Sequence, residues 1–209
     1  MKQFFRLSVV LSGMLLLSAC NNAPADPEGD KNATNPNEGN DTTGDVAYFC
    51  KKTGQIKSYD GYGNEVTDGS IKDDGYYQTG ITQAYTRDDT KEIVTDNVTG
   101  LQWQYNVAVK TVTKNWSDAK TYCDNLTFGD HVDWRLPNRT ELVSLSDYGR
   151  RDPAIDPIFT NVVSQNYWSS TAYAGGGDFA WGINFSSGSQ SVYYHKSDSY
   201  YVRCVRATQ

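Results

Sequence analysis

The C-terminal three quarters of the sequence predict a single α+β domain. Three patterns support this in chain order: turn-rich β segments over residues 54–100, two capped helices between residues 115 and 145, and alternating apolar residues from residue 179 onward. Strands and helices that occur in separate runs are typical of α+β domains. All five tryptophans and all fifteen tyrosines lie after residue 44, in a stretch long enough for one hydrophobic core.

The first β region is divided by frequent turns. Short runs such as residues 55–59 are separated by turn signals at Gly61, Gly63, Gly69 and Gly75. Residues 93–96 and 101–104 flank Asn97-Val98-Thr99-Gly100. This spacing predicts a β-hairpin with Gly100 at the position that needs a positive φ.

Two helices are predicted from their N-terminal caps. Asn115 with Asp118 three residues later resembles a capping box, and apolar residues then recur at helical spacing: Trp116, Ala119, Tyr122, Cys123 and Leu126. Asn138 with Glu141 repeats the pattern, with Leu142 and Leu145 on one face. We therefore expect one helix after Asn115 and a second after Asn138.

The last part of the chain shows a period of two. Phe179, Trp181, Ile183 and Phe185 alternate with smaller or polar residues, which predicts a half-buried strand. Ser187-Gly188 then predicts a turn into a second strand over residues 190–196. Residues 200–206 are expected to form one final strand.

The N-terminus resembles a bacterial export signal. Lys2 and Arg6 precede an apolar run over residues 7–17, which is too short to span a bilayer because a spanning helix needs roughly 20 residues. Leu17-Ser18-Ala19-Cys20 resembles the lipobox of bacterial lipoproteins, in which the cysteine is acylated. The alternative is an ordinary signal peptide with a chance cysteine. We expect residues 1–19 to be a signal peptide and Cys20 to carry the lipid anchor.

Residues 20–44 are expected to form a disordered linker on the anchored cysteine. The stretch is rich in Asn, Pro and acidic residues, with alanines as its only apolar side chains apart from Cys20. It either lifts the domain off the membrane or is a leftover of processing. Removal of residues 1–19 takes two positive charges from a net charge of −6, leaving −8. That balance disfavours nucleic acid as a partner.

Five blocks between residues 103 and 206 carry a resemblance to a known family. They are Trp103; Trp116-Ser117-Asp118-Ala119 with Tyr122-Cys123; Asp133-Trp134-Arg135-Leu136-Pro137-Asn138 with Glu141-Leu142; Tyr167-Trp168-Ser169-Ser170-Thr171; and Val202-Arg203-Cys204-Val205-Arg206. In this order they resemble the family DUF1566, the C-terminal domain of the Legionella collagen-like adhesin. The resemblance runs from about residue 52 to the end. It implies a C-type-lectin-like single domain at 45–209, with two helices, a twisted antiparallel sheet and many loops, similar also to the formylglycine-generating enzymes.

The resemblance also implies a disulfide bond between Cys123 and Cys204. The similar folds pair a cysteine of a Trp-x-x-Ala-x-x-x-Cys helix with one near the C-terminus, and exported proteins oxidise such pairs. Cys50 is then left over. It is either a free thiol or the site of an intermolecular bridge, favoured by its place beside the linker.

No catalytic residue, metal site or cofactor is predicted. The sequence has no nucleophile elbow, zinc motif or phosphate-binding loop, and two histidines are few for metal binding. The calcium-binding signatures of lectins, Glu-Pro-Asn and Trp-Asn-Asp, are absent, although acids such as Asp124, Asp130 and Asp133 leave calcium binding open. We therefore expect a protein that is not an enzyme.

Aromatic and charged residues gather in the C-terminal loops. The candidate ligand contacts are Tyr173, Asp178, Tyr193, Tyr194, His195, Lys196, Asp198 and Tyr200. Tyrosines supply stacking surface and a hydroxyl at low entropic cost, although single tyrosines also cover sheet faces. A second candidate is an anion-binding patch of Arg139, Arg150, Arg151 and Arg206, with Arg135 and Arg203 either in it or held in structural ion pairs. The named adhesin is associated with sulfated glycosaminoglycans, which such a patch would suit.

These observations predict a lipid-anchored binding protein of the bacterial envelope, at the outer membrane or cell surface. It would recognise glycan or protein ligands through its C-terminal loops, in the manner of an adhesin. The alternative is a structural or assembly component of an envelope complex without affinity for carbohydrate. Its membrane association would come from the acyl chains alone.

Overall fold

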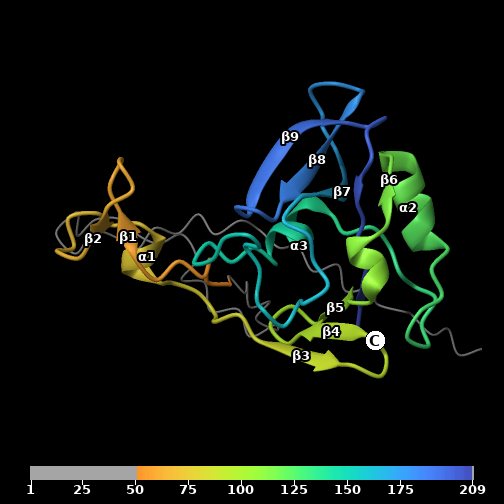
Figure 1. The fold of residues 1–209 in the computed structure, drawn as a ribbon, viewed down its shortest axis with the longest axis horizontal. Helices are drawn as coiled ribbons and strands as arrows, with labels where there is room; N and C mark the ends of the chain where they lie inside the picture. The colour runs from red at the N-terminus through yellow and green to blue at the C-terminus, as the bar shows by residue number, and fades with distance from the viewer. Residues whose placement is uncertain (1–50, 209) are drawn as a thin grey trace, which may run out of the picture. The chain divides into compact units, whose positions relative to one another are not determined.

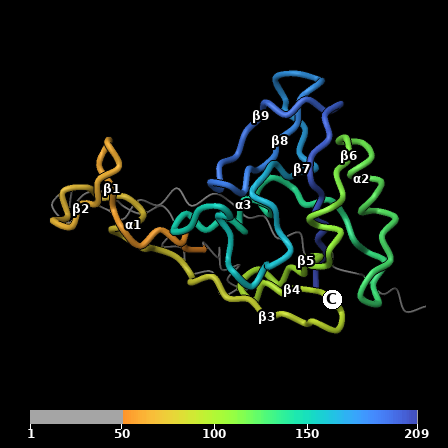
Figure 2. The backbone as a smooth tube through the Cα atoms, viewed as in Figure 1, coloured from red at the N-terminus to blue at the C-terminus, as the bar shows by residue number. Residues whose placement is uncertain are grey.

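A computed structural model describes residues 51–208, traced as a ribbon in Figure 1 and as a tube in Figure 2. The α+β class is confirmed, since short helices accompany three sheets. The strands are β1 (Ser58–Tyr59), β2 (Glu65–Val66), β3 (Tyr85–Asp88), β4 (Ile93–Asp96), β5 (Leu101–Gln104), β6 (Thr113–Lys114), β7 (Asn166–Ala172), β8 (Phe179–Asn184), β9 (Ser189–His195), β10 (Tyr200–Tyr201) and β11 (Val205–Ala207). The helices are α1 (Asp74–Tyr77), α2 (Trp116–Asp124) and α3 (Arg139–Val143), with the 3-10 helix η1 (Val107–Lys110).

A four-stranded sheet in the order β11-β5-β4-β3 contains the predicted hairpin. β4 and β5 pair antiparallel from Ile93 opposite Gln104, and Gly100 has a φ of 70°, as expected. The Asp96 carboxylate accepts hydrogen bonds from the backbone N–H groups of Val98 and Thr99 inside the turn. The turn is therefore fixed by one glycine and one buried acid.

A five-stranded sheet in the order β6-β10-β7-β8-β9 carries apolar side chains on both faces. Tyr167 and Trp168 are neighbours on β7, and successive strand residues point to opposite faces. Tyr167 packs in a cluster with residues of β4, β5 and α3, whereas Trp168 packs in a second cluster with α2. The figures show α2 alongside β6 and α3 near β7 and β8.

The expectation of a single strand over residues 200–206 is wrong. β10 lies in the five-stranded sheet, parallel to β7, while β11 lies in the four-stranded sheet beside β5. Between them, Val202, Arg203 and Cys204 are all buried as the chain crosses from one sheet to the other. Three consecutive buried residues do not fit a strand with one solvent face, so the segment divides.

The simple alternation expected along β8 is interrupted. The register with β7 and β9 shifts around Trp181, so that Ala180 and Gly182 are buried while Trp181 is only half-buried. A Cβ atom on Gly182 would lie 2.3 Å from the ring of Tyr194. The absence of a side chain at Gly182 therefore lets the tyrosine ring cross the strand.

The two predicted helices are confirmed at their caps. The Asn115 side chain accepts from the N–H of Asp118 at the start of α2, and Asn138 with Glu141 forms a complete capping box at α3. The one-turn helix α1 was not predicted, since Asp74-Gly75 was interpreted as a turn. A left-handed residue, Gln78, ends α1 after four residues.

The disulfide bond is confirmed between Cys123 of α2 and Cys204. The Sγ–Sγ distance is 2.02 Å, the Cα–Cα distance is 5.5 Å, and both residues are fully buried. The bond joins α2 to the crossing segment between the two sheets. It therefore ties together parts of the fold that are 81 residues apart in the sequence.

Several predictions concern residues outside the described range. The signal peptide, the lipidation site Cys20, the linker to residue 44, the domain start at residue 45 and Cys50 all lie there. Across residues 51–208, no helix has the length and apolar character needed to cross a membrane. The likeness to the C-type-lectin fold stays a prediction.

Candidate functional site

The loop between β7 and β8 is fastened to the end of β9. The backbone N–H of Lys196 donates to the carbonyl of Asp178 at 2.7 Å, and its ammonium donates to the carbonyl of Gly177 at 2.5 Å. Tyr173 folds over the loop, because a Cβ atom on Gly175 would lie 2.6 Å from its hydroxyl oxygen. The C-terminal loops are thus held in one arrangement by their own side chains.

A first cation–aromatic cluster lies at the start of α2. The ammonium groups of Lys120 and Lys196 each lie 4.6 Å from the ring centroid of Trp116. The indole N–H of Trp116 donates to the carbonyl of Ser169 on β7 at 2.8 Å, which fixes the ring. Lys120 follows Trp116 by four residues, so one helical turn brings the two together.

A second cluster joins α3 to β8. The guanidinium carbon of Arg139 lies 3.7 Å from the ring centroid of Trp181, and its Nε donates to the Gln190 side-chain oxygen at 2.6 Å. The Tyr173 ring meets the same indole edge-on, with centroids 6.4 Å apart. At 3.7 Å the guanidinium is stacked on the ring, within the distance range of a cation–π contact.

Both clusters contact Ser169 of β7, which is fully buried between them. Its carbonyl accepts from Trp116, and its hydroxyl donates to the carbonyl of Trp181 at 2.8 Å. Over residues 51–208, no ion pair to a carboxylate involves Lys120, Arg139 or Lys196. These three cations with Trp116 and Trp181, which form two clusters on α2 and α3, are together called the cation–tryptophan surface below. It presents positive charge that the protein itself does not neutralise.

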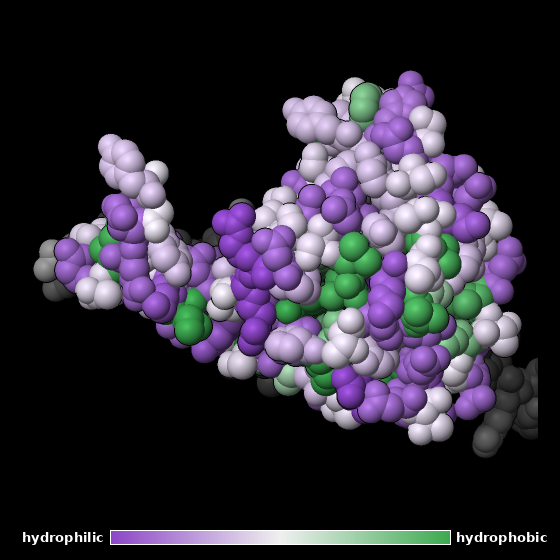
Figure 3. All heavy atoms as spheres, in the orientation of Figure 1, coloured by the Kyte–Doolittle hydropathy of each residue, from purple (hydrophilic) through white to green (hydrophobic). Residues whose placement is uncertain are grey.

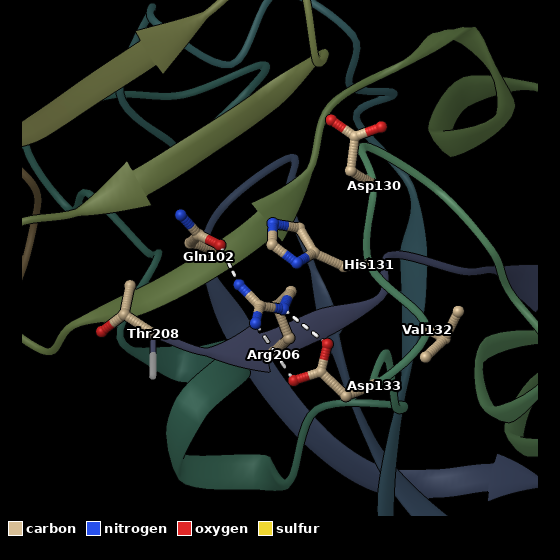
Figure 4. A pocket seen from close by; sticks show the side chains of 7 residues that line it. All are labelled: Gln102, Asp130, His131, Val132, Asp133, Arg206 and Thr208. Atoms are coloured by element: carbon tan, nitrogen blue, oxygen red, sulfur yellow. Dashed lines mark hydrogen bonds and ion pairs between the residues drawn. The ribbon is translucent and has the colours of Figure 1, made fainter.

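An open hollow of about 430 Å³ lies near the C-terminus (Figure 4). Arg206 donates to both carboxylate oxygens of Asp133, at 2.7 and 3.1 Å, and also to Gln102. This hydrogen bonding holds the pKa of Asp133 below its usual range. His131 points into the hollow beside this group (Figure 4). Asp133 and Arg206 neutralise each other, and Asp130, the other acid that lines the hollow, lies 3.3 Å from the Lys91 ammonium.

The family of the chain is decided by a comparison with protein-family models. The model of the Lcl C-terminal domain matches residues 92–206, which is more than half of the chain. The chain belongs to this family. The predicted membership is confirmed, and it indicates an adhesin-related extracellular domain of a bacterial surface protein. No curated protein matches the chain.

The Lcl C-terminal domain includes every side chain of the cation–tryptophan surface and both disulfide cysteines. It leaves out residues 51–91, which contain β1, β2, α1 and β3. Two of the five sequence blocks that carry the family resemblance contribute residues to this region: Trp116 belongs to one block and Ser169 to another.

The eight predicted ligand contacts divide by exposure. Tyr193 is 82% exposed, and Tyr173, Asp178 and Asp198 are exposed as well. The prediction of Tyr194 as a ligand contact needs correction. Its side chain is only 8% exposed, because its ring packs on Trp168 and its hydroxyl donates to Asn166. The half-buried residues among the eight are His195, Lys196 and Tyr200. Burial raises the pKa of Tyr194 to about 12, as expected for a phenol inside the core.

The four arginines of the predicted patch have separate surroundings. Arg150 pairs with Asp147 at 2.9 Å, Arg139 stacks on Trp181, and Arg151 is exposed. The prediction of Arg206 as part of an anion-binding patch needs correction, because Arg206 is buried and paired with Asp133. No contact among the described residues joins these four guanidinium groups into one patch.

The two other arginines of the motifs are structural. Arg135 donates both guanidinium NH₂ groups to Glu141 at 2.6 and 2.7 Å, which raises the arginine's pKa. Arg203 is fully buried and donates to the carbonyls of Gln104 and Asn161, and burial lowers its pKa to about 10. Both arginines therefore stabilise the fold, in agreement with the alternative that they are structural and not part of the anion-binding patch.

Trp116, Lys120 and Trp181 were not predicted from the sequence as site residues. The spacing of four between Trp116 and Lys120 on a predicted helix was available as a signal. The exposure of Trp181 was not, because it results from the irregular register in β8. Within the described part of the chain, no group of three or more His, Cys, Asp or Glu residues is arranged to hold a metal ion.

Proposed function

We propose that the protein is a surface recognition protein that binds an anionic glycan through the cation–tryptophan surface and the C-terminal loops around it. The observation that carries the proposal is the set of three cations, Lys120, Arg139 and Lys196, that lie on tryptophan rings without carboxylate partners. Other cations without an ion pair, such as Lys72, Lys110 and Arg151, lie on no aromatic ring among the described residues. Family membership supports an adhesin-related role.

The chemistry suits sulfate or carboxylate groups carried on a sugar chain. Arg139 uses its Nε on Gln190, so its two NH₂ groups stay available for a bidentate contact with an anion. Stacking on an indole fixes the guanidinium before the ligand arrives, which lowers the entropic cost of binding. Exposed Tyr173 and Tyr193 provide stacking surface beside the charges.

We place this activity outside the cytoplasm, at the outer membrane or cell surface. Acylation of Cys20 would hold the chain by two or more lipid chains, enough for stable anchoring. Intact-mass measurement of the membrane-extracted protein tests this part, since cleavage before Cys20 would remove residues 1–19 and acylation of Cys20 would add the mass of the lipid.

The binding proposal is tested with the purified protein on a glycan array that includes sulfated and unsulfated chains. We expect binding to sulfated glycans that weakens at high salt. The variant Lys120→Gln/Arg139→Gln/Lys196→Gln should bind at least tenfold more weakly, because each lost charged hydrogen bond is worth about 1.5–3 kcal/mol. Lys72→Gln/Lys110→Gln/Arg151→Gln removes the same charge elsewhere and should bind like the wild type.

Equal loss in both triple variants would show that net charge, and not this surface, governs binding. The alternative role in an envelope assembly predicts a different result. In that case the array stays blank while a defined set of envelope proteins co-purifies with the chain.

A further inference from the structure

We propose that residues 55–81, called the N-terminal arm, form a second docking surface, and that its partner is a protein segment rich in lysine and arginine. The arm contains β1, β2 and α1 and lies outside the residues matched by the Lcl C-terminal domain. The proposal is independent of the cation–tryptophan surface, whose charge has the opposite sign.

The arm exposes its large apolar side chains. Of the eleven large hydrophobic residues that are exposed in the described chain, six lie in the arm: Ile56, Tyr59, Tyr62, Tyr76, Tyr77 and Ile81. Within the same stretch only Ser58 and Gly75 are buried. In Figure 3 this region is mostly purple and pale with small green areas, because the hydropathy scale ranks tyrosine as mildly hydrophilic. Tyrosines gathered in this way, without a core of their own, mark interaction surfaces.

Polar contacts, in place of a core, hold the arm in shape. The Asp73 carboxylate accepts from Ser58 at 2.6 Å and from Gln55 at 2.8 Å, and it caps α1. The Ser58 hydrogen bond is the largest cause that lowers the pKa of Asp73. A Cβ atom on Gly75 would lie 2.1 Å from the carbonyl oxygen of Lys57, so α1 packs directly on β1. The tyrosines are therefore displayed on a fixed frame.

The β1–β2 loop displays one tyrosine most openly. Asp60 accepts from the backbone N–H groups of Tyr62 and Asn64 at 2.9 and 2.8 Å, and from the Asn64 side chain at 2.9 Å. Gly63 has a φ of 85°, which the turn requires. Tyr62 is 94% exposed at the tip. A loop ordered in this way presents the ring at little entropic cost on binding.

The charge of the arm selects the partner. Two lysines stand against five acids, which leaves a net charge of −3, and Lys57 is already paired with Glu65 at 2.7 Å. The chain's own residues 21–50 carry six acids and one lysine, so like charge disfavours them as the occupant. Anionic glycans and anionic lipid surfaces are disfavoured for the same reason. Lysine and arginine side chains satisfy both features, because they pair with carboxylates and stack on tyrosine rings.

The test measures binding of a fluorescein-labelled dodecapeptide of alternating lysine and glycine to the full chain by fluorescence anisotropy. The variant Tyr62→Ser/Tyr76→Ser should bind at least fivefold more weakly, and its matched control Val107→Ser/Val132→Ser, which removes two exposed apolar side chains outside the arm, should bind like the wild type. Asp68→Asn/Asp74→Asn should also weaken binding, whereas Asp124→Asn/Asp130→Asn, with the same change of charge, should not. All four sites are exposed, so each variant should keep the melting temperature of the wild type.

Binding that falls equally in the arm variants and in their matched controls overturns the proposal, because the peptide would then respond to net charge alone. So does undiminished binding by the tyrosine variant. The Lys120→Gln/Arg139→Gln/Lys196→Gln variant should keep full affinity for the peptide. A neutral glycan that binds the arm tightly while the lysine peptide does not would likewise contradict the choice of partner.

Discussion

Removal of the Cys123–Cys204 disulfide bond should cost a large share of the stability of the domain. The bond closes a loop with a sequence separation of 81. In the chain-entropy model, such a loop contributes about 4.5 kcal/mol by restricting the unfolded chain. The total stability of a domain is about 5–15 kcal/mol. For a domain of this size, the loss corresponds to a fall in melting temperature of roughly 9–18 °C.

Urea denaturation of the oxidised protein, the protein reduced with dithiothreitol, and the variant Cys123→Ala/Cys204→Ala measures this contribution. The reduced protein keeps both sulfur atoms in the core, so it isolates the cross-link from the lost packing volume of the alanine variant. We expect the reduced protein to lose about 4–5 kcal/mol and the variant to lose somewhat more, since both sites are fully buried. A loss below 1 kcal/mol on reduction would refute the entropic argument.

Three further changes test other parts of the fold. Gly182→Ala places a Cβ atom 2.3 Å from the Tyr194 ring, so we expect a loss of roughly 1–3 kcal/mol or more in urea denaturation; wild-type stability would contradict the packing. The pKa of Tyr194 is about 12, above the ordinary value near 10, so its contribution to stability is complete below pH 10 and disappears as the pH rises towards 12. Between pH 10 and 12 the melting temperature should fall less steeply with pH for Tyr194→Phe than for the wild type. Identical slopes would refute the raised pKa of Tyr194. Lys51→Ala leaves the carboxylate of Asp96 buried without its partner at 2.8 Å, which should cost about 3–5 kcal/mol by the same denaturation assay, while a loss under 1 kcal/mol would show that the pair is solvated.

Local patterns predicted much of the fold correctly. The hairpin at Gly100 and the caps at Asn115 and Asn138 depend on side chains that act on backbone groups within a few residues, so the sequence alone contains the whole interaction. The disulfide bond followed from the family resemblance, and both cysteines lie in motifs of that family.

The division of the last strand could not be predicted in the same way. Residues 200–206 were predicted as one strand, but which sheet each half joins depends on partners far away in the sequence, Tyr167 for Tyr201 and Trp103 for Val205. The same limit applies to Trp181, whose exposure depends on a register shift against two neighbouring strands.

In the candidate site, the ion pairs of the charged residues depend on tertiary packing, which the sequence does not show. Arginine content suggested a patch, yet Arg206 and Arg150 pair with Asp133 and Asp147, and these pairs are long-range or depend on a loop. Lys196 was predicted as a ligand contact, and its association with Trp116 depends on the packing of α2 beside the last hairpin. The sequence shows which residues are charged. It does not show which of them form ion pairs in the fold, and therefore not which cations are left without a carboxylate partner.

Tryptophan fluorescence during titration with a sulfated glycosaminoglycan hexasaccharide tests the central claim most directly. Trp103, Trp134 and Trp168 are buried, so Trp116 and Trp181 should report any ligand that reaches the cations stacked on them. We predict a saturable change in emission that Trp116→Phe/Trp181→Phe abolishes and an unsulfated hexasaccharide does not produce. An unchanged spectrum at saturating sulfated ligand, or the same change in the double variant, would contradict the assignment of this surface as the binding site.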